Sequence, residues 1–388
     1  MRIRVLDNIS EVAAGEWNAL AGGSHPFLRH EFLNALETSG CVSAETGWQP
    51  CHLLLQDDQD KTVGAMPLYL KSHSRGEFVF DWAWASAYQR AGYDYYPKLL
   101  NAVPFTPVAG PRFLCAGAES GADGAEAPAL LLAGAVELAH RLEASSLHCL
   151  FPTPEDAGWM KERGMMLRTD CQFHWRDDGY ADFSDYLKTF SSAKRKKVNR
   201  ERRRVKEAGI RFETLSGDAL TPELWEALYP LYAASYLKRG QYPYLSHNFF
   251  EQVTREMPES LVVFLARLDG EAVALAICFR SDTALYGRYW GSRGYYHSLH
   301  FETCYYQGIE YCIREGLTLF DPGVQGEHKL ARGFLPVTSF STHWVRHEGF
   351  ADALTGYLDR EREQVAHYIE IAGEHTPFKN EGAGLAVK

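Results

Sequence analysis

The sequence ALYGRYWGSRGYYHSLHFETCYYQGIEYCIREGLTLFDPG, residues 284–323, decides the fold. The aromatic-rich run 284–290 predicts a strand, and the two glycines of 291–294 predict a turn. Apolar residues at helical spacing predict a helix over 298–315, and the short apolar run 317–320 predicts a second strand. A strand, a helix and a strand in this order form a βαβ unit, whose helix N-terminus can receive an anion.

Two carboxylates of this unit are candidates for proton transfer. Glu302 lies in the first turn of the predicted helix, for which Ser298 can serve as N-cap, and it can act as a general base toward an amine. The alternative is a glutamate that only compensates the helix dipole. Asp321 ends the second strand and so faces the usual ligand crevice of an α/β sheet, or else it caps the turn at Pro322-Gly323.

Other polar residues of this stretch can assist. Tyr289 carries a phenol that can protonate a leaving group. His328, Lys329 and Arg332 follow the second strand, and they can neutralise an oxyanion or a phosphate, or simply be exposed.

Length and composition describe an ordinary soluble protein. The chain has 388 residues, 46% of them hydrophobic, and a net charge of −10, which favours two domains or one large one. We expect neither a membrane span nor a secretory signal, and hence a cytoplasmic protein. The eight cysteines lack metal-ligand spacing, so we expect reduced thiols and no metal.

A basic run interrupts this acidic chain. Residues 194–206 contain nine basic side chains and one acidic one, and the spacing of Val198 and Val205 predicts a helix ending near Gly209. Such a patch suits an anionic partner: coenzyme A phosphates, a tRNA backbone, or a phospholipid or lipid-diphosphate head group. A solvated helix face without a ligand is the alternative.

The chain repeats one pattern. Each half has a hairpin, an aromatic-rich strand, a helix and a short strand, expected at 51–70, 78–84, 127–144 and 147–151, and again at 261–279, 284–290, 298–315 and 317–320. Residues 116–127 predict a loop. We therefore expect two α/β domains, 1–170 and 171–348, followed by a C-terminal helix and tail, 349–388.

Aromatic residues are also dense in the first half. Trp82, Trp84, Tyr88 and Tyr93 can line an acceptor pocket, or they can pack in the core at strand ends.

The second half resembles the Fem family of aminoacyl transferases that build peptidoglycan cross-bridges. The resemblance rests on Leu285-Tyr-Gly287, on Leu319-Phe-Asp-Pro-Gly323, on Lys329-Leu-Ala-Arg-Gly-Phe334 and on the basic helix that runs into Gly209-Ile210. Pro107-Val-Ala-Gly-Pro-Arg112 is similar to the Fem-like group of peptidoglycan biosynthesis and recognition proteins. The family implies two tandem GNAT-type acyltransferase domains, each a mixed twisted sheet flanked by helices.

The resemblance also implies a reaction. It is transfer of an acyl or aminoacyl group to a small-molecule or peptide amine, such as a cell-envelope or peptidoglycan precursor, from acyl-CoA or aminoacyl-tRNA. Arg288, Gly291, Ser292 and Arg293 align with the GNAT phosphate loop, and Lys329 and Arg332 join them as donor-binding candidates, while the basic helix can hold tRNA. His328 joins the aromatic residues as an acceptor-binding candidate. The alternative is a non-catalytic protein that recognises an envelope ligand in the groove between the domains.

Overall fold

The computed structural model describes residues 1–23, 25–115, 126–324 and 326–379. Most of the predicted loop 116–127 therefore lies outside the described residues. The chain divides into two compact units, and each is discontinuous in sequence. Unit 1 comprises residues 1–170, 244–257 and 338–366, and unit 2 comprises 171–243, 258–337 and 367–388. The expected domain ranges 1–170, 171–348 and 349–388 remain a prediction.

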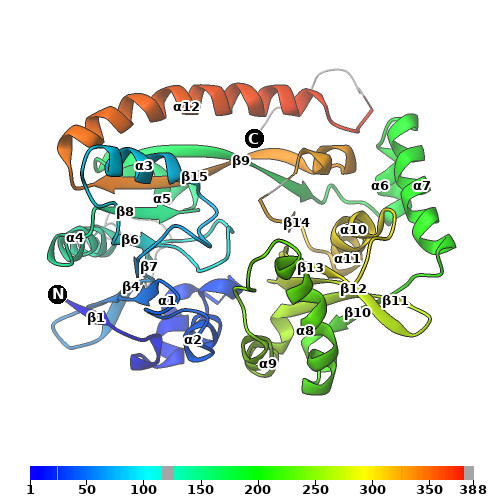
Figure 1. Ribbon diagram of the computed structural model, residues 1–388, viewed down its shortest axis with the longest axis horizontal. Coiled ribbons are helices and arrows are strands. Elements are labelled where there is room, and N and C mark those ends of the chain that lie inside the picture. Colours follow the sequence, from blue (N-terminus) through cyan, green and yellow to red (C-terminus); the bar gives the residue numbers. More distant parts are fainter. Residues whose placement is uncertain (24, 116–125, 325, 380–388) are drawn as a thin grey trace. The chain divides into compact units, whose positions relative to one another are not determined.

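Unit 1 contains two sheets and the helices that cover them (Figure 1). The first sheet has the order β1-β3-β4-β7, and the second contains β2, β5, β6, β8 and the last part of β15. Its strands are β1 (Arg2–Leu6), β2 (Trp48–Pro50), β3 (His52–Gln56), β4 (Thr62–Met66), β5 (Tyr69–Lys71), β6 (Lys98–Asn101), β7 (Leu114–Cys115) and β8 (Ser146–Leu150). Its helices are α1 (Ala14–Ala21), α2 (His30–Thr38), α3 (Trp82–Arg90), α4 (Glu126–Arg141), α5 (Pro154–Glu162) and α9 (His247–Glu256), with 3₁₀ turns η1 (Ile9–Glu11) and η2 (Pro26–Leu28).

Unit 2 contains one mixed sheet in the order β10-β11-β12-β13-β14, continued by β9. Its strands are β10 (Arg211–Ser216), β11 (Leu261–Leu268), β12 (Glu271–Arg280), β13 (Ala284–Ser292) and β14 (Leu319–Asp321). Its helices are α6 (Phe183–Lys188), α7 (Ser192–Glu207), α8 (Pro222–Leu237), α10 (Leu299–Phe301), η6 (Glu302–Tyr306, a π-helical turn) and α11 (Gln307–Glu315), with 3₁₀ turns η4 (Gly217–Ala219), η5 (Pro258–Ser260) and η7 (Glu327–Arg332). Three elements contain residues of both units: β9 (Met166–Arg176), β15 (Leu335–Val345) and α12 (Glu348–Glu374).

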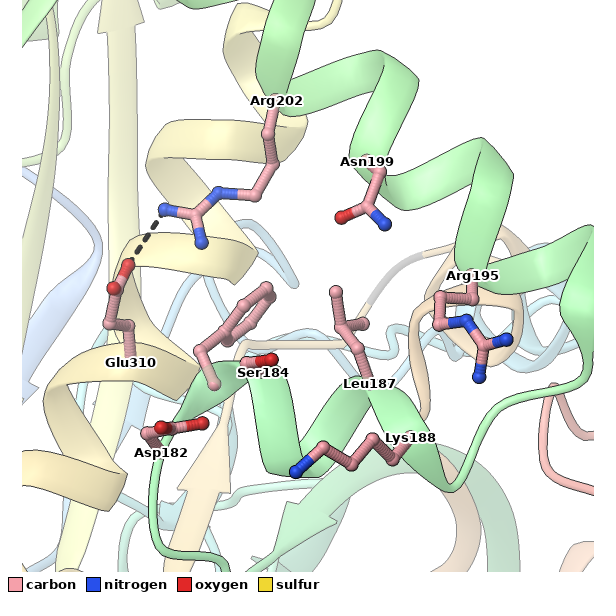
Figure 2. Close-up of a pocket in the computed structure, with 9 residues that line it drawn as sticks. Asp182, Ser184, Leu187, Lys188, Arg195, Asn199, Arg202 and Glu310 are labelled. Atoms are coloured by element: carbon pink, nitrogen blue, oxygen red, sulfur yellow. Dashed lines mark hydrogen bonds and ion pairs between the residues drawn. The ribbon is translucent and has the colours of Figure 1, made fainter.

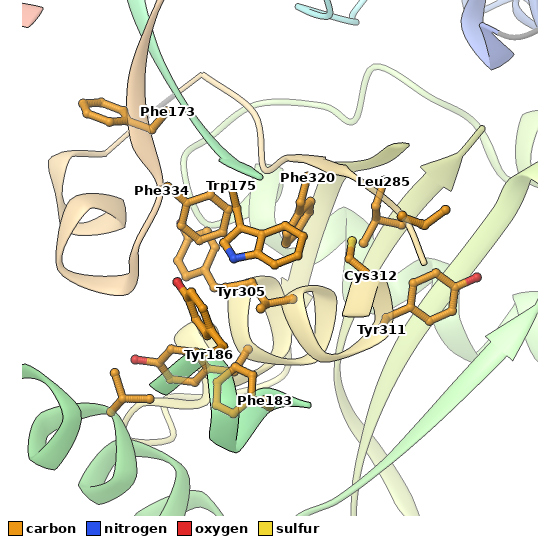
Figure 3. Packing of buried hydrophobic residues seen from close by; sticks show 14 of the residues in the cluster. Phe173, Trp175, Phe183, Tyr186, Leu285, Tyr305, Tyr311, Cys312, Phe320 and Phe334 are labelled. Atoms are coloured by element: carbon orange, nitrogen blue, oxygen red, sulfur yellow. The ribbon is translucent and has the colours of Figure 1, made fainter. Parts of the chain in front are cut away.

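The predicted βαβ unit of the second half is present. β13 and β14 pair in parallel, and the helical segment from α10 to α11 connects them. Buried aromatic residues pack this helical segment against the sheet and against α6. Figure 3 shows Trp175 and Phe320 from the sheet, Tyr305 from the helical segment and Tyr186 from α6. The predicted hairpin at Asp269-Gly270 is confirmed, since both residues have positive φ.

Two predictions about glycine and serine in this unit are wrong. Gly291 and Ser292 do not form a turn but end β13, opposite Leu275 and Ala274 of β12. Ser298 precedes α10 with φ of 66°, and its side chain does not cap the helix but contacts His297 Nδ1 at 2.6 Å.

One strand of the first half is a helix instead. Residues 82–90 form α3, so the prediction of a strand over 78–84 is wrong. The alternation of Trp82 and Trp84 suggested a strand, whereas Trp84 and Tyr88, four residues apart, share the buried face of a helix. The strand that pairs in parallel with β8 is β6, and β7 of the other sheet lies between β6 and α4 in the chain.

Gly291 lets α8 approach the sheet closely. A Cβ atom built on Gly291 would lie 1.9 Å from the carbonyl oxygen of Leu231, a backbone atom of α8. We therefore expect Gly291→Ala to destabilise the protein by about 3 kcal/mol or more, because the helix has to move away from the strand. Urea denaturation measures the loss.

Gly294→Ala is the matched control for this substitution. Its Cβ would meet the Tyr296 ring at 3.7 Å, an ordinary van der Waals contact. Equal stability of the two variants would contradict the close approach of α8.

Candidate functional site

The candidate site lies where β13 and β14 separate. The two strands pair over three residues, and their last pair is Tyr286 and Asp321. β14 ends there, whereas β13 continues alongside β12 to Ser292. A position at the carboxyl ends of parallel strands, where neighbouring strands part, is the usual place for a ligand in an α/β sheet.

Asp321 is the last residue of β14, and it caps the following turn as one of its two predicted alternatives has it, while its role toward a ligand stays a prediction. Its Oδ1 accepts a hydrogen bond from the Gly323 backbone N–H at 2.8 Å, so the side chain caps the turn. Its Oδ2 lies 3.7 Å from His174 Nε2, and the carboxylate is buried. His174 is brought there by the antiparallel register of β9 and β14, which pairs Phe320 with Trp175.

Lys329 is the buried cation of the site. Its Nζ donates to the carbonyl oxygen of Gly323, two residues beyond Asp321. Burial lowers the pKa of Lys329 to about 8, Asp321 acts to raise it, and Arg288 lowers it further. A buried lysine with a lowered pKa at the end of a strand is a candidate for a functional residue.

Lys329 influences three histidine side chains, of which the sequence predicted His328 as a site residue but not His174 or His300. Its charge helps to lower the pKa of His174, His300 and His328, after burial in each case. The His300 ring, whose pKa is lowered to about 4, lies 5.2 Å from the Trp290 ring and 6.0 Å from the His328 ring. Trp290, His300 and His328 belong to a strand end, a short helix and a 3₁₀ turn. Spacing along the chain therefore gives no signal that their rings lie close together.

Glu302 and Tyr289 lie in enclosed surroundings. The Glu302 carboxylate accepts from Arg202 at 3.0 Å and from Gln307 at 2.8 Å, which lower its pKa, but burial outweighs them and the pKa is raised. The Tyr289 ring packs against the Tyr232 ring of α8 at 5.3 Å. Their catalytic roles stay predictions.

The four residues aligned with a phosphate loop are spread over different surroundings. Arg288 is half-buried and close enough to Lys329 to lower its pKa. Gly291 meets α8, and the Ser292 carbonyl oxygen accepts from Lys238 Nζ at 3.0 Å. Arg293 is exposed and lies 3.5 Å from Glu271.

The predicted basic helix is confirmed as α7, and a buried ion pair and a half-buried one hold it in place. Glu201 of α7 accepts from Arg332 of η7 at 2.9 and 3.0 Å, and the Tyr306 hydroxyl also donates to it. Arg202 of α7 pairs with Glu302 and, at 2.7 Å, with Glu310. The Arg332 guanidinium stacks 3.4 Å from the centre of the Phe301 ring, so this predicted donor-binding residue is enclosed.

The remaining predicted site residues differ in exposure. His328 is exposed, and its Nε2 lies 2.8 Å from the Tyr305 hydroxyl. In unit 1, Trp82 and Tyr93 are exposed, whereas Trp84 and Tyr88 are buried in a cluster with Tyr95 and Leu358.

Unit 1 also holds a buried charge network that the sequence did not reveal. Lys98 Nζ donates to Glu77 at 2.7 Å and to Asp81, and Asp81 accepts from the Tyr95 hydroxyl at 2.6 Å. Burial raises the pKa of Glu77 to about 7 and lowers that of Lys71 to about 7. The described residues contain neither a cluster of ligands placed for a metal ion nor a helix long and apolar enough to cross a membrane.

The fold belongs to the class with two tandem GNAT-type domains, each a mixed twisted sheet flanked by helices. The FemX crystal structure superimposes with a TM-score of 0.54 at 13% identity, over 92% of this chain and 100% of that one. The C-terminal domain of a putative lysylphosphatidylglycerol synthetase from Agrobacterium fabrum gives 0.53 at 10% identity, over 88% and 94%. The L-PGS of Bacillus licheniformis gives 0.50 at 9% identity, over 90% and 97%. Identities this low show the fold alone.

The family follows from the sequence match. Residues 8–380 match the FemAB-like family, described as peptidoglycan biosynthesis/recognition, and the chain belongs to that family. The resemblance inferred from the sequence is thereby confirmed. No curated protein matches the chain.

The buried pair between Glu201 and Arg332 generates the first prediction for this site. Glu201→Gln leaves the Arg332 charge buried without its carboxylate, so we expect a loss of about 3–5 kcal/mol in the free energy of unfolding. Glu207→Gln, on the same helix, removes only an exposed pair with Arg203 and should cost less than about 1 kcal/mol. Chemical denaturation compares them, and similar losses would show that the buried pair does not hold α7.

The lowered pKa of Lys329 generates the second prediction. The folded chain releases this proton at about pH 8 and an ordinary lysine at 10.5, so between these values the unfolded chain binds more protons. The free energy of unfolding should therefore rise with pH in this window by up to about 3 kcal/mol relative to Lys329→Met. Denaturation of both proteins below, within and above the window tests this, with Lys188→Met as an exposed control. Parallel pH profiles of wild type and Lys329→Met would refute it.

Proposed function

We propose that this protein is an acyltransferase that moves an acyl or aminoacyl group from an activated donor to an amine. Family membership and the GNAT-type fold support the transferase class. The observation that carries the proposal is the buried Asp321 and Lys329, which lie together where β13 and β14 separate. A fold hosts many chemistries, so the assignment depends on these side chains rather than on the fold.

The reaction needs a neutral amine. The amine lone pair attacks the donor carbonyl carbon, the carbonyl π electrons move onto oxygen, and the resulting oxyanion collapses to expel the thiolate of CoA or the ribose oxygen of tRNA. One proton leaves the amine for a base, and the leaving group receives a proton. Asp321 suits the base, with His174 beside it at 3.7 Å, because Glu302 already accepts hydrogen bonds from Arg202 and Gln307.

Lys329 suits the stabilisation of the oxyanion. With a pKa of about 8 its ammonium is mostly charged at neutral pH, and burial strengthens its interaction with a developing negative charge. Tyr289 remains the predicted donor of a proton to the leaving group.

The donor is acyl-CoA or aminoacyl-tRNA, both of which are polyanions of the cytoplasm. α7 offers exposed cations to phosphates, among them Lys196, Arg203 and Lys206. The acceptor class we propose is an amine of a peptidoglycan or other envelope precursor, in line with the family's description.

A non-catalytic recognition protein is the second candidate. Gly291 and Ser292, which align with the phosphate loop, belong to the part of β13 that pairs with β12. The family's description also includes recognition. In that case the same site binds an envelope precursor without transferring a group to it.

Labelled acetyl-CoA, long-chain acyl-CoA and aminoacyl-tRNA, each supplied with a muropeptide precursor, distinguish the two candidates. We expect transfer from one donor, and a fall of about 10²-fold or more for Asp321→Asn, because the amide cannot take a proton but can still cap the turn at Gly323. Asp178→Asn changes an exposed carboxylate of the same unit and is the control.

Two results would overturn the enzyme proposal. One is precursor binding without transfer from any of these donors, which favours recognition. The other is full activity of Asp321→Asn, which removes Asp321 from the chemistry.

A further inference from the structure

A cavity beside α7 has no part in the chemistry proposed above. It has a volume of about 640 Å³ and lies in unit 2 among α6, α7 and α11 (Figure 2). Its lining consists of Asp182, Phe183, Ser184, Leu187, Lys188, Arg195, Asn199, Arg202 and Glu310. Three of these residues are cations and two are acids.

The two acids are engaged within the protein. Asp182 is the N-cap of α6, and its Oδ1 accepts from the Asp185 N–H at 2.7 Å. Glu310 pairs with Arg202 at 2.7 Å, and the Arg202 guanidinium lies 4.5 Å from the centre of the Phe183 ring. Both acids are therefore held in place, and the Glu310 charge is paired with Arg202.

Donors on the opposite wall are available to a ligand. Arg195 and Asn199 are one helical turn apart on α7, and their side chains extend toward α6 in Figure 2. Within the described part of the chain, the Arg195 guanidinium forms no ion pair and the Asn199 amide no hydrogen bond. Lys188 lies across the cavity, and its contact with Asp185 at 3.4 Å is exposed.

From this arrangement we propose that the cavity binds a phosphate group. An arginine, a lysine, an amide and the Ser184 hydroxyl around one space are the donors that phosphate oxygens accept from, and arginine can bind two of those oxygens at once. The cavity exceeds the size of one phosphate, and Phe183 and Leu187 give it an apolar floor for the organic part of a phosphate ester. The proposal does not depend on the acyl-transfer chemistry.

The exposed face of α7 extends this site. Arg195, Asn199, Arg202 and Lys206 follow one stripe of the helix, and Lys196 and Arg203 lie beside it. Cations along the rim raise the local concentration of phosphate esters around the cavity. The ester can come from a soluble molecule or from a lipid head group.

Arg195→Ala tests the proposal against a matched control, Arg200→Ala. Both residues carry one positive charge on α7, but Arg200 lies about 140° away around the helix and outside the cavity lining. Calorimetry with pyrophosphate should give binding that is about tenfold weaker in Arg195→Ala and unchanged in Arg200→Ala. Asn199→Asp, which adds a negative charge at an exposed position of the lining, should weaken binding similarly.

Vesicles identify the source of the phosphate. Binding of pyrophosphate in solution supports a soluble ester. Binding only to phosphatidylcholine vesicles that contain phosphatidic acid, with a larger loss in Arg195→Ala than in Arg200→Ala, supports a lipid head group. Equal losses in the two variants would mean diffuse attraction by the helix, and this result, or no binding of either probe, would overturn the proposal.

Discussion

The structure of unit 2 depends on ion pairs between α7 and the segments on either side of the point where β13 and β14 separate. α7 supplies a carboxylate, Glu201, to Arg332 and a guanidinium, Arg202, to Glu302 and Glu310. A buried charge without its partner is costly, so each pair restricts the position of both partners. Since Arg332 and Lys329 belong to the same short turn, η7, the pair that anchors the helix also positions the lysine beside Asp321.

The two units share a crossover but distribute charge differently along it. β6 and β8 pair in parallel with α4 in the connection between them, as β13 and β14 do with the α10–α11 segment, although the first connection also contains β7 of the other sheet. In unit 2 the buried charges lie at the carboxyl end, where Asp321 is the last residue of β14. In unit 1 they lie at the opposite end, since Lys98 is the first residue of β6. Ligands of α/β sheets usually bind at the carboxyl ends of parallel strands, and the reaction site that we propose lies at this end in unit 2.

Local chemistry made much of the fold predictable from the sequence. Asp269-Gly270 could be read as a hairpin and Gly209 as the end of the basic helix, because positive φ at these positions is a property of a few residues. The turn predicted at Gly291 failed because that glycine accommodates the backbone of a helix some 60 positions earlier in the chain. The sequence could identify Asp321 as the end of a strand. It could not identify His174 as the neighbour of Asp321, since only the register of β9 against β14 brings the two together.

The π-helical turn of η6 has a consequence for how this segment can vary among relatives. A π turn holds one more residue than an α turn and is often found at functional sites. Loss of one residue between Glu302 and Tyr306 would restore a regular helix and rotate the preceding residues, His300 among them, by about 100° relative to α11. Deletion of one codon would therefore replace His300 beside His328 with another side chain. Length variation in this turn would change the site more than most substitutions around it.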